Sequence, residues 1–159
     1  MRSRTTIWFE AKIRYEKMME DGCLKKVTET YVVDALSFGE AEKRILEEMT
    51  SYVSGEVEVC ALKIAPYKEI FFADSNMDDK WYVAKLAFIT IDEKTDKKKK
   101  TRVCYLVNAG NINAAIKNIE EVMAGTMIDY DTLNVSETQI LDVFEYKPKG
   151  ENKPEKGDN

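Results

Sequence analysis

The segment WFEAKIRY, Trp8 to Tyr15, decides the architecture, because it returns later in the chain as WYVAKLAF, Trp81 to Phe88. At this offset of 73 residues, three positions are identical and three more are conservative exchanges. At an offset of 74, ten of the 26 positions from 25 to 50 are identical to those from 99 to 124. Self-similarity at a fixed period is typical of a duplicated structural unit, so we predict two tandem repeats.

Each repeat begins with two predicted strands and a helix. Apolar and polar residues alternate from Phe9 to Tyr15, which is typical of a strand with one buried face. A polar turn with Gly22 follows, and then a second alternating segment. Ser37 and Glu40 have capping-box spacing, so a helix should start there. The helix carries an apolar stripe of Phe38, Ala41, Ile45, Met49 and Tyr52. We expect it to end near Gly55.

The second repeat follows the same plan. Asn111 takes the helix-cap position and Gly125 the end of the helix, with an apolar stripe between them. Further strand-like segments close the two units, at 56–64, 70–72, 131–135 and 140–146. Pro66 breaks the first of these closing segments, because proline cannot donate a hydrogen bond to a neighbouring strand.

These elements predict an α+β fold of two tandem ββαβ(β) repeats, with antiparallel sheets and one helix per repeat. We expect a pseudo-twofold arrangement, because a unit of about seventy residues buries a marginal core alone. The expected divisions are a first repeat at 1–73, a linker at 74–80, a second repeat at 81–146 and a disordered tail at 147–159.

Composition excludes several kinds of chemistry. The chain has no histidine, which removes Ser-His-Asp and Cys-His catalysis and His-ligated zinc. Its three cysteines lie far apart, and 74–85 lacks the Gly and Glu that a calcium loop requires. We therefore expect no enzyme activity, no cofactor and no metal. No segment approaches a bilayer span and no secretory signal is present, so we expect no membrane association and a cytoplasmic location.

Several stretches of the chain resemble a known family. The resemblance lies in Trp8-Phe9-Glu10, in the run from Glu29 to Phe38 and in Glu40-Ala41-Glu42, with further matching stretches at 79–82 and 88–93. Together they are similar to a family of uncharacterised small proteins, a domain of unknown function, over about residues 7–146. The resemblance implies gut anaerobic bacteria and their phages or mobile elements as the setting. It implies no catalytic residues.

Two features are candidate contacts for a ligand or for nucleic acid. Trp8 with Lys12 and Trp81 with Lys85 recur on the strand face away from the helix, where an indole could stack on a base. Equally, both indoles could seal the join between the halves, which is the interpretation we favour. The second feature is a basic hairpin with Lys97, Lys98, Lys99, Lys100 and Arg102, which could contact successive phosphates. A solvated turn is the simpler interpretation of these residues.

A third feature favours a protein interface. The outward side of the first strand is polar in repeat one, but in repeat two it carries the apolar stripe Val83, Ala87, Ile89 and Ile91. Such a stripe requires a covering surface, either the other half or another molecule. Our leading hypothesis is a non-enzymatic binding or adaptor protein of phage or mobile-element character with a protein partner, and a homodimer is possible. The alternatives are an accessory nucleic-acid-binding protein and a phage inhibitor of a host system.

Overall fold

The structure is a computed structural model that describes residues 1–146, so the expected tail at 147–159 lies outside the described residues. Within that range the fold is α+β, with two helices and nine strands. In chain order these are β1 (Arg2–Arg4), β2 (Trp8–Met18), β3 (Leu24–Asp34), α1 (Phe38–Met49), β4 (Glu58–Ile64), β5 (Glu69–Phe72), β6 (Lys80–Ile91), β7 (Lys98–Ala109), α2 (Ile112–Ala124), β8 (Asp129–Glu137) and β9 (Ile140–Phe144).

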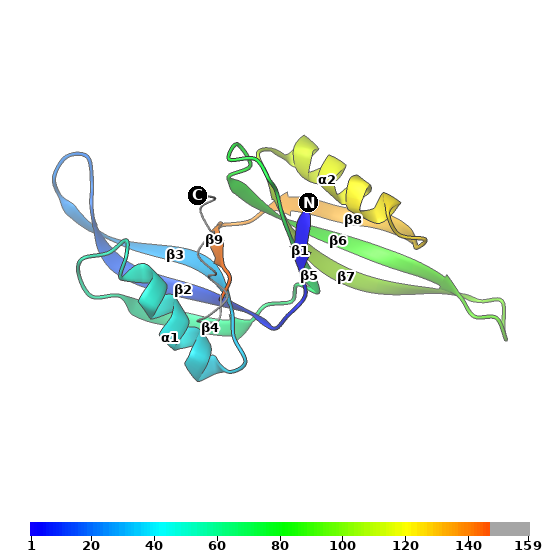
Figure 1. Cartoon of the computed structure of the whole chain (residues 1–159), viewed down its shortest axis with the longest axis horizontal. Coiled ribbons are helices and arrows are strands. Elements are labelled where there is room, and N and C mark those ends of the chain that lie inside the picture. Colours follow the sequence, from blue (N-terminus) through cyan, green and yellow to red (C-terminus); the bar gives the residue numbers. More distant parts are fainter. Residues whose placement is uncertain (147–159) are drawn as a thin grey trace, which may run out of the picture.

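The strands form two sheets, in the orders β4-β2-β3-β9 and β8-β6-β7-β5-β1. A long antiparallel hairpin lies at the centre of each, β2–β3 in the first sheet and β6–β7 in the second. The two hairpins extend in opposite directions from the middle of an elongated molecule (Figure 1). Gly22, with a φ of 81°, lies in the turn at one end, where Gly adopts the left-handed conformation without steric cost.

Each sheet is completed from the other half of the sequence, the first sheet by β9 and the second by β5 and β1. Strand β9 pairs in parallel with β3, and β5 pairs in parallel with β7. The sheets are therefore mixed, which corrects the expectation of purely antiparallel sheets. Pro66 lies between β4 and β5, where the chain leaves the first sheet and enters the second. Proline cannot donate a ladder hydrogen bond, so the strand ends there.

The helices begin as expected. The Ser37 hydroxyl accepts a hydrogen bond from the Glu40 amide at 3.1 Å, and the Asn111 side chain accepts one from the Ala114 amide at 2.9 Å. Gly125 is the C-cap of α2, as predicted, but the C-cap of α1 is Thr50, five residues before Gly55. The Thr50 hydroxyl donates to the Glu47 carbonyl at 2.6 Å, which satisfies a free acceptor at the helix end.

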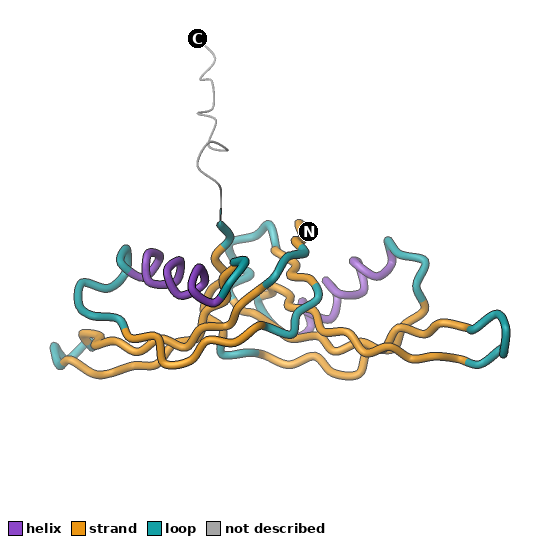
Figure 2. Tube along the Cα trace, turned by 90° about the horizontal axis from the view of Figure 1, so that it is seen from below, coloured by secondary structure: helices purple, strands orange, loops and turns teal. Residues whose placement is uncertain are grey.

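Both helices lie on the same side of the sheets (Figure 2). Helix α1 packs on Ala11 and Ile13, and α2 packs on Ala84 and Leu86. Because successive strand residues point to opposite faces, the alternate residues of β2 and β6 lie on the other side. We call that side of the two sheets the helix-free face.

A third cluster joins the two sheets at the centre of the molecule. Trp8, 1% exposed, and Trp81, 5% exposed, lie in it with apolar residues of both halves. Phe72 contacts both indoles, with ring centroids 6.5 Å from Trp8 and 5.5 Å from Trp81. The halves therefore share one buried cluster at their join.

None of the helices in 1–146 is both long and apolar enough to traverse a bilayer.

An ion-pair network beside this join connects β1 with the residues that follow β9. The buried Asp34 carboxylate lies 2.8 Å from the Arg4 guanidinium and accepts the Tyr146 amide at 2.6 Å. Arg44 of α1 donates to the Asp34 carbonyl at 2.5 Å and pairs with Glu40. Strand β1, which the sequence did not predict, is held by this network and by pairing with β5.

Candidate functional site

Positive side chains collect on the helix-free face of the first sheet. Lys12 and Arg14 alternate with Ala11 and Ile13, which pack beneath α1, so the two cations point the other way. Lys26 lies opposite Glu16, and Lys63 opposite Glu10, on the same face. All four cations are exposed: Lys12, Arg14, Lys26 and Lys63.

The second sheet places four more exposed cations on this face. Lys85 lies between the buried Ala84 and Leu86 and therefore points away from α2. On β7, three cations lie opposite the outward residues of β6. These are Lys98, Lys100 and Arg102, in register with Ile91, Ile89 and Ala87.

The basic hairpin predicted from the sequence is therefore divided between two faces. Lys99 lies opposite Thr90, so it points to the other side of the strand pair from its neighbours Lys98 and Lys100. Lys97 precedes the first residue of β7 and belongs to the turn. The structure brings Lys98, Lys100 and Arg102 together with Lys85, and leaves Lys97 and Lys99 apart.

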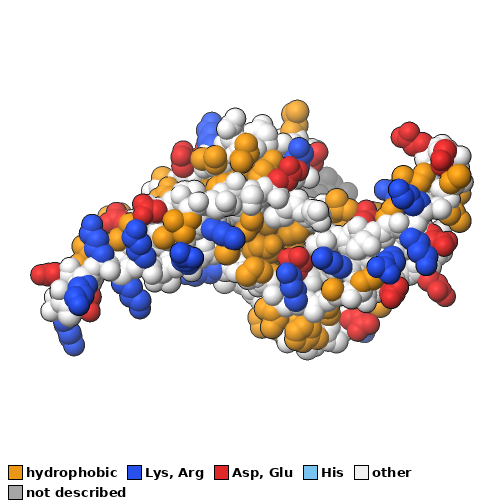
Figure 3. Space-filling model, turned by 180° about the vertical axis from the view of Figure 1, so that it is seen from behind, with side chains coloured by type: hydrophobic (Ala, Val, Ile, Leu, Met, Phe, Trp, Pro, Cys, Tyr) orange, Lys and Arg blue, Asp and Glu red, His pale blue; other side chains and the backbone are white. Residues whose placement is uncertain are grey.

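Few of these cations are neutralised. Lys100 lies 3.5 Å from Asp131, and Lys63 lies 3.9 Å from Glu10. Within residues 1–146 the other six form no ion pair within 4.0 Å. Figure 3 shows this side of the molecule, with Lys and Arg along both arms and hydrophobic side chains between them. The acidic side chains that this face carries by register are fewer: Glu10, Glu16, Glu58, Asp129 and Asp131.

The two tryptophans take no part in this surface. Their burial in the join contradicts the base-stacking role, because an indole that is at most 5% exposed offers no face to a nucleobase. It agrees with the other interpretation, in which both rings seal the join. The Trp8 Nε1–H is buried without a hydrogen-bond partner among the described residues.

The predicted apolar interface is also less exposed than expected. Ala87 is 2% exposed, between Arg102 on β7 and Asp131 on β8, and Val83 and Ile89 are half-buried. Only Ile91, at 60%, is exposed among the four. The stripe is therefore not a continuous apolar surface.

A cavity of about 310 Å³ opens on the helix-free face where the halves meet. Glu10, Lys12 and Lys63 from the first half line it together with Tyr67 and Thr138. The Tyr67 hydroxyl donates to a Glu10 carboxylate oxygen at 3.4 Å. Burial, and then the Glu10 charge, raise the pKa of Tyr67 above its ordinary value, so this phenol stays a hydrogen-bond donor.

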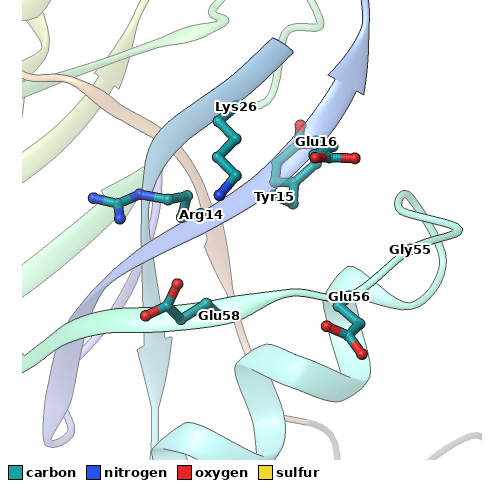
Figure 4. Close-up of a pocket in the computed structure, with 7 residues that line it drawn as sticks. All are labelled: Arg14, Tyr15, Glu16, Lys26, Gly55, Glu56 and Glu58. Carbon is teal, nitrogen blue, oxygen red and sulfur yellow. The ribbon is translucent and has the colours of Figure 1, made fainter. Parts of the chain in front are cut away.

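A second hollow, of about 360 Å³, lies farther out on the first arm (Figure 4). Arg14 and Lys26 line it with the exposed carboxylates of Glu16, Glu56 and Glu58, so opposite charges are mixed. Such a site can make polar contacts. Within 1–146, no group of three Cys, Asp or Glu side chains is placed to hold a metal ion.

Sequence reasoning missed three of the eight cations as candidates. Arg14 is two residues from Lys12 on the same strand, and Lys26 and Lys63 lie on the strands that flank β2. The alternation of β2 could have assigned Arg14 to the same face as Lys12. Lys63 could not be placed, because the pairing of β4 with β2 contains a register shift between Lys12 and Ile13.

Comparison with known proteins gives one family. The model of the family described as Domain of unknown function (DUF4494) matches residues 7–146. No curated protein and no solved structure matches the chain.

Proposed function

Because the chain belongs to the DUF4494 family, a domain of unknown function that assigns no activity, we propose from its surface that it is a non-enzymatic nucleic-acid-binding protein. It would contact the phosphate backbone through the helix-free face. One observation carries the proposal: exposed cations from both sheets share this face in a chain whose net charge is −5. We also propose that the two halves are tandem repeats related by a pseudo-twofold axis, because such a relation would place equivalent cations of both halves on one surface.

The charge distribution favours a defined orientation on a polyanion. Positive charge on one face attracts phosphates, while the acid excess of the remaining surface repels them. Lys and Arg side chains on a sheet surface reach phosphate oxygens without contacting base edges, so binding would be independent of sequence. Each neutralised phosphate releases counterions, which makes the affinity fall as salt rises.

Charge reversal on the two faces tests the proposal. The variant Lys12→Glu/Lys85→Glu removes one cation from each arm, and Lys43→Glu/Lys117→Glu is the matched control, because these exposed lysines lie on α1 and α2. Affinity for a fluorescent oligonucleotide is measured by anisotropy between about 50 and 200 mM salt. We expect the face variant to weaken binding at least about tenfold and to reduce the salt slope by about 2.

Equal loss in the helix variant, or binding that does not depend on salt, would contradict the proposal. Circular dichroism melting curves of both variants show whether a loss of binding reflects unfolding. Both pairs of substitutions change the net charge equally, so they isolate the position of the charge from its amount.

A specific observation supports the adaptor hypothesis as a second candidate. Phe38 contacts the buried Phe9 and Ile64 pairs with it in register at the β4 edge of the first sheet, and both are exposed, at 51% and 59%. Ile7, at 46%, and Leu36, at 79%, are exposed on the two segments that the Ala35 amide and the Ile7 carbonyl join. Exposed apolar clusters mark protein contacts. A protein partner would then bind at this apolar surface. The protein would be an adaptor, or a phage inhibitor of a host system. Either would be of bacterial, phage or mobile-element character and would act in the cytoplasm.

Affinity purification of the tagged protein, with and without nuclease, separates the two candidates. Partners that survive nuclease and are lost in Leu36→Asp would favour the adaptor. Co-purified nucleic acid that is lost in Lys12→Glu/Lys85→Glu would favour the nucleic-acid proposal.

A further inference from the structure

We infer that the cavity of about 310 Å³ on the helix-free face binds a phosphate monoester, the group that ends a phosphorylated nucleic-acid strand. The inference rests on the proposed function and adds a defined site to it, because the exposed cations account for contacts to the backbone but give the cavity no role. Three observations carry it: the place of the cavity between the sheets, the donors that line it, and the different residues at the corresponding positions of the second half.

The exchange of strands between the two sheets produces this cavity. Part of its lining belongs to the two segments by which the chain crosses from one sheet to the other, 65–68 and 138–139. The rest belongs to the first sheet, where Thr30 lies opposite Lys12 and pairs on its other side with Ile140. Thr30 is 7% exposed, although it shares the helix-free face with the exposed Lys12. The cavity is therefore a recess in this face and not part of its open surface.

The cavity offers donors that are free to bind an anion. Within residues 1–146, Lys12 forms no ion pair and the Thr30 hydroxyl forms no hydrogen bond. Lys63 and Tyr67 both contact the Glu10 carboxylate, at 3.9 and 3.4 Å. Two ammonium groups thus accompany a single carboxylate that already has partners, which leaves the lining with a net positive charge.

The second half of the chain shows that the sheets do not require these polar side chains. Its strand register gives the position that corresponds to each lining residue of β2, β3 and β4. Lys12 keeps its chemistry there, as Lys85. The other three positions hold an apolar or a small side chain: Val83 for Glu10, Cys104 for Thr30 and Ser136 for Lys63. The second sheet forms without the carboxylate, the hydroxyl and the second ammonium group, so their presence in the first sheet points to a ligand.

A terminal phosphate suits this recess better than a phosphate inside a strand. A monoester carries a charge of about −1.5 to −2 at pH 7 and three free acceptor oxygens, and it is attached to the strand by one bond. Lys12, Lys63 and Thr30 can donate to these oxygens while the strand leaves through the open side toward the other cations of the face. An internal diester has a smaller charge, and its chain must enter the recess and leave it again.

The experiment compares three oligonucleotides of one sequence, which end in a 5′-phosphate, in a 3′-phosphate or in hydroxyl groups alone. Their affinity for the full chain is measured by anisotropy with an internal fluorophore. We expect the better of the two phosphate-ended strands to bind at least about tenfold more tightly than the hydroxyl-ended strand, because charge-assisted hydrogen bonds form with the terminal phosphate alone.

Two substitutions in the cavity should remove this preference. Thr30→Val keeps the shape of a buried side chain without its hydroxyl, and Lys63→Gln removes the charge of an exposed one. Each should lower the ratio of the two affinities to about twofold or less. The matched controls should keep the ratio: Cys104→Val, at the position that corresponds to Thr30, and Lys43→Gln on α1. Circular dichroism shows whether Thr30→Val folds, and the exposed Lys63→Gln decides the outcome if it does not.

Titration with adenosine 5′-monophosphate, followed by nuclear magnetic resonance, identifies the source of the phosphate. Shifts should centre on the amides of Lys12 and Thr30, and adenosine alone should not cause them. Mononucleotide binding as tight as that of the phosphate-ended strand would overturn the assignment to a strand end. Equal affinity of the three strands, or a preference that Lys63→Gln leaves unchanged, overturns the inference but leaves the proposed function. Failure of every strand to bind overturns both.

Discussion

Replacing Asp34 by Asn should destabilise the fold by weakening the junction of β1 with the residues that follow β9. The Asp34 side chain is 4% exposed and bonds to Arg4 at 2.8 Å and to the Tyr146 amide at 2.6 Å. Asn keeps the shape and one acceptor but removes the charge, so two guanidinium groups lose a shared partner. The sequence counterpart of Asp34 in the second half is Asn108, which donates to the Lys80 carbonyl at 3.0 Å and has no charged partner.

The magnitude follows from burial. Removing one partner of a fully buried ion pair costs about 3–5 kcal/mol. Arg4 is 35% exposed and keeps Glu145, and Arg44 keeps Glu40, so we reduce the expected loss to about 2–3 kcal/mol. For a chain of this size that corresponds to a fall in Tm of about 5–10 °C.

Urea unfolding followed by circular dichroism measures this free energy. The control is Glu42→Gln, an exposed carboxylate on α1 with no ion pair within the described range. Hydrogen exchange should show β1 opening first in the Asp34 variant, because Arg4 belongs to that strand. If Asp34→Asn lies within about 0.5 kcal/mol of the parent, the network does not stabilise the junction and the reasoning is wrong.

Three further predictions concern the core and the sheets. Trp8→Ala should lower the free energy of unfolding, measured by urea titration, by about 3–5 kcal/mol, because the indole is buried. Iodide should not quench the tryptophan fluorescence of the parent protein, and efficient quenching would show that the indoles are exposed. Burial, and then Glu29, raise the pKa of Tyr15 to about 12, so the stability from its neutral phenol is complete below about pH 10 and lost between pH 10 and 12. Glu29→Gln should shift this tyrosinate absorbance titration to lower pH, and an unchanged titration would exclude Glu29 as a cause. Ending the chain before β9 removes the buried Ile140 and Val143 and should cost about 3–6 kcal/mol, visible as a lower thermal midpoint unless β9 merely covers the edge of β3.

Local patterns predicted the hairpins and helices because their causes are local. Alternation placed Ala11 and Ile13 on the buried side, and the Ser37 and Asn111 caps set both helix starts. The exchange of β5 and β9 was not predictable, since short apolar segments show no preference for one sheet over another. Strand β1 contains no apolar residue at all, so no hydrophobic pattern could indicate it.

The candidate site was predicted in part. The recurrence of Lys12 and Lys85 indicated a surface on both halves of the chain, and both side chains are exposed on the helix-free face. The role of the indoles could not be decided from the sequence, because Trp8 and Trp81 share their strand face with the lysines. What separates them is position along the strand: the tryptophans lie at the join of the sheets, and the lysines lie beyond it.

The exchange of strands between the two halves determines when the first sheet can be completed during translation. When β3 leaves the ribosome, its partner β9 has not been synthesised, because Thr30 pairs with Ile140, 110 residues later. At ordinary rates of translation this edge stays open for about 5–20 s. Synthesis of β9, and not of the first half of the chain, is therefore the event that closes the first sheet. During that interval the exposed edge of β3 is a candidate contact for chaperones.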